Sequence, residues 1–447
     1  MGKLFGTDGI RGVANKDLTP ELAFKIGRIG AYVLQQQSSG KNAFLIARDT
    51  RISGSMLEGA LIAGITSVGV NVYTAGVIST PAAAYLTKQL NGCGGVMISA
   101  SHNPYPDNGI KFFSANGFKL PDEVEEEIEQ LFFQGEDALP RPEAGALGCV
   151  LQYSTAAERY LQHILSTVSH RLDGFRVVLD CANGAVYSLA PQAFKALGAE
   201  VISCNDSPDG RNINYHCGST YPEALISLMQ QHRADFGFTF DGDADRVLAV
   251  DSNGQLLDGD AIMTILAKNL QEKGRLCHDT VVTTVMSNLG LEKAAQTCGF
   301  KLLRTKVGDR YVLERMLEEG CNLGGEQSGH IILLQHTTTG DGLLTALQLA
   351  NVVAEKKQSL AQLAAAYKRY PQVLVNCRVD KRDGWEQNLR IQAAIKATEK
   401  KLAGQGRLLV RPSGTEPLIR VMLEGANEAD LHMMANSLAQ IIKEELA

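Results

Sequence analysis

The sequence predicts an α/β protein of three similar domains followed by a smaller α+β domain, and two observations lead to this fold class. A unit made of an apolar strand, a polar loop, a helix, a glycine and a second strand occurs three times along the 447 residues. The segment after about residue 370 does not repeat that unit. At about 100–200 residues per domain, the chain has room for three or four domains. One large doubly wound sheet is the alternative arrangement of the same elements.

The three copies of the unit share their order and their glycine stop. In the first copy, the apolar run 43–47 is followed by the polar Arg48-Asp49-Thr50, a helical pattern ending near Gly69 and a second apolar run at 70–73. A glycine at the end of a helical pattern is a typical helix stop. The order of strand, helix and strand predicts a βαβ unit for each copy. The copies occupy residues 43–73, 176–203 and 281–303.

Composition and turn signals indicate where the domains end. Residues 135–148 (GEDALPRPEAGALG) are rich in proline, glycine and charge, which is typical of a linker. A hairpin with an Asn-Gly turn is predicted at 247–257, and a new domain is expected just past it. A helical stretch at 360–369 precedes Tyr370-Pro371, and beyond it two strands enclose a helix before a final helix at about 428–445. The predicted domains are 1–148, 149–254, 255–369 and 370–447.

Charge and cysteine usage exclude several classes of protein. With 43 Lys and Arg against 49 Asp and Glu, the net charge of −6 argues against bulk binding to nucleic acid or an anionic membrane. The nine cysteines include no C-x-x-C pair, which is typical of reduced thiols in a cytosolic protein rather than of disulfides or structural zinc. The start, MGKLFGTDGIRG, has no secretory signal, and no apolar run approaches the roughly 20 residues that cross a bilayer. We therefore expect a cytoplasmic protein with no nucleic-acid or membrane partner.

The strongest local signal for chemistry is the run Asp241-Gly242-Asp243-Ala244-Asp245-Arg246. It follows the predicted strand end 238–240 and places carboxylates at every second position. Three such groups can present oxygens to one hard divalent cation, which would also relieve their mutual repulsion. The run is no EF-hand, because its sixth position is Arg246 rather than Gly and its twelfth is Ser252 rather than Glu. An acidic surface turn is the alternative.

A second polar loop, Ser99-Ala100-Ser101-His102-Asn103-Pro104, follows the small apolar run 94–98, which predicts a buried strand. The carboxyl end of a strand is the usual ligand position in open α/β sheets. On the residues alone, Ser101 is either a nucleophile or a turn residue. No G-x-S-x-G elbow is present, which argues against a lipase-type hydrolase.

A lysine follows the serine loop at position 111. A lysine beside a cationic cluster can have a depressed pKa and act as a general base. The alternative is a solvated surface lysine.

Two further polar loops have side chains that suit a phosphorylated sugar. The loop 324–330 (GGEQSGH) offers Glu and Ser side chains to sugar hydroxyls, or is a plain turn. The loop 411–417 (RPSGTEP), with Arg420 beyond it, offers a guanidinium, hydroxyls and backbone N–H groups to a phosphate. No P-loop and no complete G-x-G-x-x-G is present, which argues against nucleoside triphosphates and dinucleotides.

Taken together, these motifs resemble the α-D-phosphohexomutase superfamily, and the resemblance spans the chain. The family order is followed by 7–12 (TDGIRG), 99–104, 241–246, 325–330 and 411–417, with 305–310 (TKVGDR) as a further match. Ala244 stands where many relatives carry Gly, but the carboxylates are intact. The resemblance implies three α/β domains with mixed sheets and a smaller C-terminal α+β domain around a central cleft.

The resemblance also implies roles for individual residues. Ser101 becomes the phosphorylated serine and Lys111 the acid/base, with His102, Arg11 and Arg246 as further catalytic residues. The implied metal is one Mg²⁺ per chain on Ser101, Asp241, Asp243 and Asp245. The implied substrate-binding residues are Lys306, Glu326, Ser328, His330, Arg411, Ser413, Gly414, Thr415 and Arg420.

By this resemblance, the protein is a mutase for a small hexosamine phosphate. It would interconvert glucosamine 6-phosphate and glucosamine 1-phosphate, with glucosamine or glucose 1,6-bisphosphate as intermediate or activator, and so feed UDP-N-acetylglucosamine and cell-wall precursors. The alternatives are a phosphoglucomutase or phosphomannomutase, a non-catalytic sugar-phosphate sensor, and a metal-dependent phosphatase. A monomer or a homodimer is expected.

Overall fold

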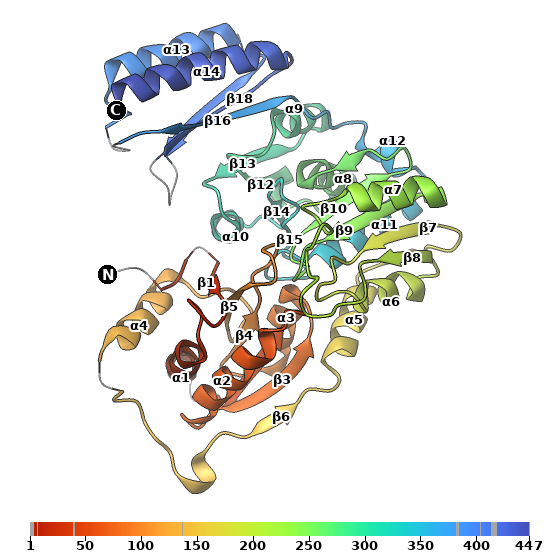
Figure 1. Ribbon diagram of the computed structural model, residues 1–447. Helices are drawn as coiled ribbons and strands as arrows, with labels where there is room; N and C mark the ends of the chain where they lie inside the picture. The colour runs from red at the N-terminus through yellow and green to blue at the C-terminus, as the bar shows by residue number, and fades with distance from the viewer. Residues whose placement is uncertain are drawn as a thin grey trace. The chain divides into compact units, whose positions relative to one another are not determined.

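The computed structural model describes residues 4–6, 8–38, 41–135, 137–380, 384–402, 404–412 and 418–446. These residues form two compact units, the first comprising Met1–Val285 and Phe300–Ala365 and the second comprising Met286–Gly299 and Ala366–Ala447. Three sheets belong to the first unit and one to the second. The predicted α/β class is therefore confirmed, with a smaller C-terminal sheet domain (Figure 1). The four predicted domain boundaries stay predictions.

The first sheet has six strands in the order β1-β5-β4-β2-β3-β6. Its middle strands are parallel, whereas β5 runs antiparallel to both β4 and β1, so the sheet is mixed. Strand β6 lies past the predicted linker and still pairs with β3. The strands are β1 (Ile10–Val13), β2 (Ala43–Arg48), β3 (Asn71–Val77), β4 (Gly94–Ile98), β5 (Asp107–Ser114) and β6 (Val150–Gln152). The helices are α1 (Pro20–Gln37), α2 (Gly54–Thr66), α3 (Thr80–Leu90) and α4 (Asp122–Phe133).

Close packing of α3 on β4 explains the small residues of that strand. All five residues of β4 are buried. A Cβ added at Gly95 would lie 2.1 Å from Thr87 Oγ1 of α3, so only glycine fits there. The helix begins where the Ser79 side chain accepts a hydrogen bond from the Ala82 backbone N–H, and it ends at Asn91 in the left-handed conformation. This packing holds β4, the strand that leads into the serine loop.

The second and third sheets repeat the mixed pattern, with the antiparallel hairpin β10–β11 at the predicted Asn-Gly turn. Their strand orders are β11-β10-β9-β7-β8 and β13-β12-β14-β15. The second sheet contains β7 (Arg176–Asp180), β8 (Glu200–Cys204), β9 (Phe236–Phe240), β10 (Val247–Asp251) and β11 (Leu256–Leu257), with α5 (Ala156–Ser166), α6 (Leu189–Ala196) and α7 (Glu223–His232). The third contains β12 (Thr280–Thr284), β13 (Lys301–Thr305), β14 (Leu323–Gly325) and β15 (Ile331–Leu333), with α8 (Gly259–Glu272), α10 (Asp309–Glu319), α11 (Gly342–Lys356) and α12 (Leu360–Ala364).

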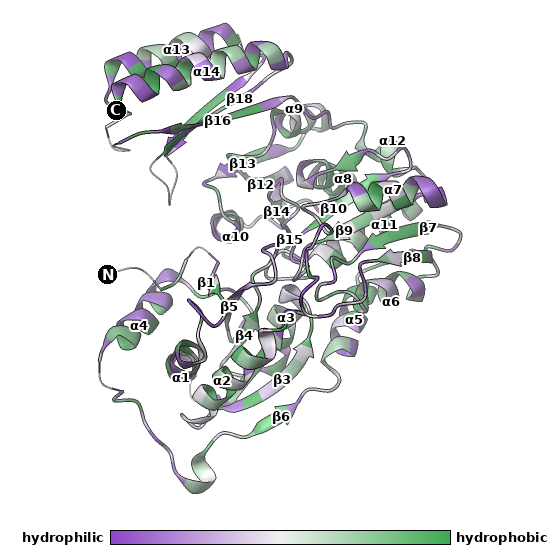
Figure 2. Cartoon of the chain, in the orientation of Figure 1, coloured by the Kyte–Doolittle hydropathy of each residue, from purple (hydrophilic) through white to green (hydrophobic). Residues whose placement is uncertain are grey.

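The second unit is an antiparallel sheet in the order β16-β18-β17, on which apolar residues of α13 and α14 pack. In Figure 2 both helices carry hydrophilic and hydrophobic residues, as expected for helices with one buried side. Helix α9 joins this unit because the Glu424 carboxylate accepts hydrogen bonds from Asn288 Nδ2 (3.1 Å) and Leu289 N (3.1 Å) at the helix start. Its elements are α9 (Leu289–Cys298), β16 (Gln372–Arg378), α13 (Leu389–Leu402), β17 (Arg407–Pro412), β18 (Leu418–Glu424) and α14 (Glu428–Glu445).

One predicted helix is shorter than expected. The stretch predicted over 360–369 is helical only as α12, at Leu360–Ala364. The Asn288 side chain hydrogen-bonds both the backbone N–H (2.9 Å) and the carbonyl (3.0 Å) of Tyr370, which holds the chain in a non-helical conformation before β16. All nine cysteines are free. Within the described ranges, no helix combines the length and the apolar character needed to cross a bilayer.

Candidate active site

Three loops of the first unit meet at the carboxyl ends of strands from three different sheets. The serine loop (99–104) follows β4, the acidic loop (241–246) follows β9, and the loop 326–330 follows β14. Backbone bridges join the last two, since Val247 N donates to Gly329 O at 3.2 Å and Arg246 pairs with His330. Ser101 contacts the acidic loop directly. The strand ends therefore bring together side chains up to about 230 positions apart, as open α/β sheets do with their ligand sites.

Ser101 is fully buried, and its hydroxyl points at the acidic loop. Its Oγ donates to Asp241 Oδ2 at 2.6 Å. The residue adopts φ +53°, a left-handed conformation that costs a non-glycine residue about 1–2 kcal/mol. Two hydrogen bonds offset this cost, because the Ser101 carbonyl accepts from Arg51 Nη2 (2.9 Å) and Asn214 Nδ2 (2.8 Å). The loop therefore presents Ser101 in one fixed orientation.

The three aspartates of the acidic loop form a buried cluster whose ligand oxygens all lie within 4.8 Å of one another. Asp243 Oδ1 and Asp245 Oδ1 are buried without a hydrogen-bond partner among the described residues. Burial, followed by the charges of Asp245 and Asp243, raises the pKa of Asp241 well above its ordinary value. Unsatisfied carboxylate oxygens in a crowded cluster are what a hard divalent cation requires. The residues present therefore fit such a cation, and the surface-turn alternative is wrong.

Lys111 lies on β5, beside Met97 of β4, and its side chain is only 2% exposed. Its Nζ lies 2.9 Å from Asp243 Oδ2 and 3.1 Å from Asp8 Oδ2. The alternative of a solvated surface lysine is therefore wrong. The expected depression of its pKa is wrong as well. Burial favours the neutral amine, but the carboxylates of Asp243, Asp8 and Asp245 outweigh it and raise the pKa above the ordinary lysine value.

His102 is held as a neutral imidazole beside Ser101. Arg246 Nη1 donates to His102 Nδ1 at 2.6 Å, and the same ring nitrogen lies 3.4 Å from Ser101 Oγ. Burial, then the positive charges of Arg246 and Arg11, lower the pKa of His102 to about 4. Arg11 itself pairs with Asp8 at the edge of the first sheet. The predicted catalytic residues Arg11, His102 and Arg246 thus lie in one charged cluster with Ser101 and Lys111.

The third loop places two of the predicted sugar ligands near the acidic loop. Gly340 N donates to His330 Nε2 at 3.1 Å, so a neutral His330 carries its hydrogen on Nδ1, which lies 3.5 Å from Asp245 Oδ2. Glu326 Oε1 accepts from Gly308 N at 3.3 Å, and burial raises the pKa of Glu326. Ser328 and Lys306 are exposed, the latter beside Gly308 in the loop 306–308. These two have no contact here that assigns them a role.

The predicted phosphate residues lie in the second unit. Arg411 of β17 and Arg420 of β18 are opposite each other in the antiparallel register. Burial, and then the charge of Arg420, lower the pKa of Arg411. Two adjacent guanidinium groups repel, and an anion between them relieves that repulsion. Ser413, Gly414 and Thr415 lie outside the described residues.

Sequence reasoning missed the residues that hold the site together. Asp49 accepts from Ser99 Oγ (2.6 Å) and pairs with Arg51 (3.0 Å), which in turn binds the carbonyl of Ser101. Thr80 Oγ1 donates to Asp243 Oδ2 at 2.5 Å. Asp8 lies in the motif 7–12 (TDGIRG), but the sequence analysis assigned it no role. The polar run at 48–51 at a strand end was the available signal for Asp49 and Arg51, whereas nothing in the sequence marks Thr80.

Comparison with known proteins identifies the family to which this chain belongs. Sequence models of the phosphoglucomutase/phosphomannomutase family match four successive segments of the chain. Alpha/beta/alpha domains I, II and III match residues 2–139, 158–254 and 258–370, and the C-terminal domain matches 374–441. The chain therefore belongs to the phosphoglucomutase/phosphomannomutase family, and it is an enzyme of the phosphohexomutase class, an isomerase.

Its relatives narrow the group within that family. A phosphoglucosamine mutase of Brevibacillus brevis is 56% identical over 447 residues, covering 100% of both chains. Among solved structures, a phosphoglucomutase/phosphomannomutase family protein of Burkholderia thailandensis has a TM-score of 0.82 at 24% identity, covering 99% of this chain and 97% of its own. An N-acetylphosphoglucosamine mutase of Aspergillus fumigatus, solved with GlcNAc-6P and magnesium, has a TM-score of 0.70 at 18% identity, covering 99% and 96%. Within the family, the chain groups with the bacterial phosphoglucosamine mutases.

Proposed function

We propose that the enzyme interconverts glucosamine 6-phosphate and glucosamine 1-phosphate through a phosphoserine at Ser101 and a sugar 1,6-bisphosphate. The observation that carries this proposal is the buried hydroxyl of Ser101, fixed 2.6 Å from a cluster of three carboxylates. A hydroxyl in that position can hold a phosphoryl group next to a cation. The 56% identity to a phosphoglucosamine mutase supports the amino sugar as substrate.

The chain's own residues account for the transfer. The bond between phosphorus and Ser101 Oγ breaks as a bond between phosphorus and a sugar oxygen forms. The sugar hydroxyl loses its proton, and Ser101 Oγ gains one and becomes a hydroxyl. His102 lies beside Ser101, and Arg246 donates to the His102 ring, so these two side chains are placed to orient the transferring oxygens. The reverse step then returns the other phosphoryl group of the bisphosphate to Ser101. Burial of Ser101 keeps water away, which a mutase needs in order not to hydrolyse its phosphoserine.

We assign the proton transfers to Lys111. The protonated amine is suited to give its proton to the Ser101 oxygen as the phosphoryl group leaves. To accept the proton of the sugar hydroxyl, Lys111 must first be neutral. A cation held by Asp243, whose carboxylate lies 2.9 Å from Lys111 Nζ, would favour the neutral form. One group can thus serve as acid and base in successive steps.

Asp241, Asp243 and Asp245, with an oxygen at Ser101, would hold one Mg²⁺. When bound, the ion neutralises the charge that develops on a transferring phosphoryl group. We assign Glu326, Ser328, His330 and Lys306 to the sugar, and Arg411, Ser413, Gly414, Thr415 and Arg420 to the phosphate that does not react. The enzyme would work in the cytoplasm, as a monomer or homodimer, on a small hexosamine phosphate.

A coupled assay with glucosamine 6-phosphate tests the proposal. Turnover should be highest on this sugar and should increase with a trace of sugar 1,6-bisphosphate, which phosphorylates any unmodified Ser101. Higher turnover on glucose or mannose 6-phosphate would assign the chain to phosphoglucomutase or phosphomannomutase activity instead. Release of inorganic phosphate in place of isomerisation would indicate a phosphatase.

Substituting Lys111 with methionine is expected to lower kcat by about 10²–10⁴-fold while substrate affinity stays close to normal, because acid–base groups contribute on that scale. Methionine keeps the length of the side chain and removes the proton carrier. Lys88→Met, at an exposed lysine of α3, is the matched control and should leave kcat unchanged. Steady-state kinetics on both variants makes the measurement. A normal kcat in Lys111→Met would remove Lys111 from the mechanism.

A second prediction concerns the phosphate that does not react. A mutase holds its sugar in two opposite orientations, so this phosphate hangs from carbon 1 in one and from carbon 6 in the other. A site that recognises phosphate alone serves both orientations. We therefore expect Arg420→Ala to weaken binding of glucosamine 6-phosphate and glucosamine 1-phosphate by similar factors. A charged hydrogen bond is worth roughly 1.5–3 kcal/mol, which corresponds to about 10- to 150-fold.

Equilibrium binding of both isomers to the unphosphorylated variant checks this expectation. Arg390→Ala, at an exposed arginine of α13 that pairs with Glu445, is the control and should bind both isomers normally. If Arg420→Ala weakened one isomer only, each phosphate would have a site of its own.

A further inference from the structure

Lys119 joins two carboxylates from different parts of the first unit. It follows β5, and a backbone bridge between Phe113 and Lys119 folds it back against that strand. Its Nζ lies 2.5 Å from Oδ1 of Asp8, which precedes β1, and 2.5 Å from Oδ2 of Asp309, which begins α10. The side chain of Lys119 is 14% exposed. This lysine lies outside the loops that carry the assigned site residues.

All three groups of this cluster are charged. Burial opposes the charge of Asp8, but the three cations around it outweigh burial and hold the pKa of Asp8 well below its ordinary value. Burial likewise opposes the charge of Lys119, yet the carboxylates of Asp309 and Asp8 raise its pKa above the ordinary lysine value. Burial and then the charges of Lys119 and His330 act on Asp309, and the net effect lowers its pKa. One ammonium group is therefore shared by two carboxylates.

Asp8 connects Lys119 to the residue assigned to proton transfer. Its Oδ2 lies 3.1 Å from Lys111 Nζ and also accepts from Arg11 Nη2, whereas its Oδ1 accepts from Lys119. Because the two oxygens have different partners, the carboxylate group cannot rotate without losing one of them. The Lys111 amine lies between Asp8 and Asp243, whose Oδ2 is 2.9 Å away. Without the Lys119 contact, the carboxylate is free to turn both oxygens toward Lys111 and to draw the amine away from Asp243.

Asp309 anchors Lys119 on its other side. It begins α10 directly after the loop 306–308, and its Oδ2 lies 3.5 Å from His330 Nε2. Gly308 of the same loop donates its backbone N–H to Glu326 Oε1 at 3.3 Å. Lys119 is thus fixed against the segment that carries the predicted sugar ligands, and from there it holds the carboxylate beside Lys111.

We propose that Lys119 is a positioning residue of the mutase, which acts through Asp8 to keep the Lys111 amine beside the acidic loop. This rests on the proposed role of Lys111 in proton transfer. The alternative is an ion pair that only stabilises the fold. The two differ in their kinetics, because a positioning residue has no further effect on kcat once Lys111 is removed, whereas a general loss of order lowers kcat in either background.

A double-mutant cycle on the full-length enzyme separates these two roles. Lys119→Met keeps the length of the side chain and removes its charge, and it should lower kcat about 10- to 100-fold, the scale on which a small displacement of a reacting group acts. In the Lys111→Met background, the same substitution should change kcat by less than about twofold. The cycle is measured on whichever hexose 6-phosphate the wild type isomerises fastest, so a wrong sugar in the proposed function does not affect the result.

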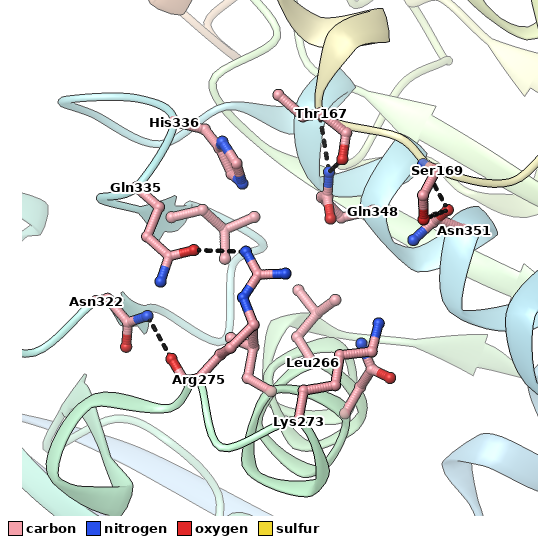
Figure 3. A pocket seen from close by; sticks show the side chains of 13 residues that line it. Thr167, Ser169, Leu266, Lys273, Arg275, Asn322, Gln335, His336, Gln348 and Asn351 are labelled. Atoms are coloured by element: carbon pink, nitrogen blue, oxygen red, sulfur yellow. Dashed lines mark hydrogen bonds between the residues drawn. The ribbon is translucent and has the colours of Figure 1, made fainter.

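Lys273→Met is the matched control. Lys273 lines the polar pocket shown in Figure 3 and pairs with Glu355 at 2.5 Å, the same distance as in the ion pairs of Lys119. This substitution should leave kcat unchanged with and without Lys111. Thermal unfolding of every variant reports whether the fold is intact. If Lys119→Met does not fold, the whole cycle is run on an Asp309→Ala background, which removes one of the two carboxylates that the lost ammonium group leaves unpaired.

The outcomes distinguish failure of this proposal from failure of the proposed function. Wild-type kcat in Lys119→Met would overturn the positioning role. So would a double variant whose loss of kcat equals the product of the two single losses, and if Lys111→Met is itself slow, that result leaves the proposed proton transfer intact. Normal kcat in Lys111→Met would contradict the proposed proton transfer, and the positioning role of Lys119 with it.

Discussion

Replacing Ser101 with alanine is expected to reduce mutase turnover by roughly 10⁴-fold or more, the scale on which loss of a covalent nucleophile acts. The hydroxyl is fully buried and donates to Asp241 at 2.6 Å. Thr80, whose Oγ1 contacts Asp243, begins a helix and supports the loop from the side. Intact-mass analysis should find one phosphoryl group on the active wild type and none on the variant.

The control for this experiment is Ser99→Ala. Ser99 is buried two positions earlier, and its Oγ donates to Asp49 rather than to the acidic loop. This variant is expected to lose some rigidity of the loop and yet to accept a phosphoryl group on Ser101. Thermal unfolding of both variants shows whether the fold is intact. Near-normal turnover in Ser101→Ala would end the phosphoserine proposal.

Removing divalent cations is the second change with a large expected effect. Exhaustive chelation should abolish turnover, and Mg²⁺ should restore it, because the three buried carboxylates, two of which have an unpaired oxygen, otherwise repel one another. A readout independent of activity is available. A ligand that binds only the folded state at 100 times its Kd adds about 2.7 kcal/mol of stability, so Mg²⁺ should raise the Tm of the metal-free enzyme.

Asp243→Asn should lose most of this Mg²⁺-dependent rise in Tm, since it removes one ligand charge. Asp173→Asn, at an exposed carboxylate that pairs with Arg171, should keep it. Full turnover after complete removal of metal would show that the aspartate cluster has another purpose.

The repeated βαβ units could be predicted because each loop follows a strand directly in the sequence. The acidic loop follows β9 and the serine loop follows β4, and local order alone gives both placements. The predicted final helix is α14. The shortened α12 was not predictable, because the amide that holds Tyr370 in place comes from Asn288, 82 positions earlier.

The environment of Lys111 could not be read from the sequence for the same reason. Its main partner, Asp243, is 132 positions away, and its burial depends on strand β5 lying inside a mixed sheet. Local reasoning left a surface lysine or a depressed pKa as the choices, and both are wrong. The hydrogen bonds that fix Ser101 could not be predicted either, since Asn214, which donates to the Ser101 carbonyl, is 113 positions away in the sequence. Long-range contacts of this kind decide the charge of a catalytic group, whereas the residue type decides only what it is able to do.

The central claim is that Ser101 passes its phosphoryl group to the sugar. Enzyme carrying a radiolabelled phosphoryl group on Ser101 can be mixed with unlabelled glucosamine 6-phosphate and quenched within one turnover. The account predicts that the label leaves the protein and is found in the sugar bisphosphate and then in glucosamine phosphate. Label that stays on the protein while substrate is converted, or that leaves only as inorganic phosphate, would contradict the account.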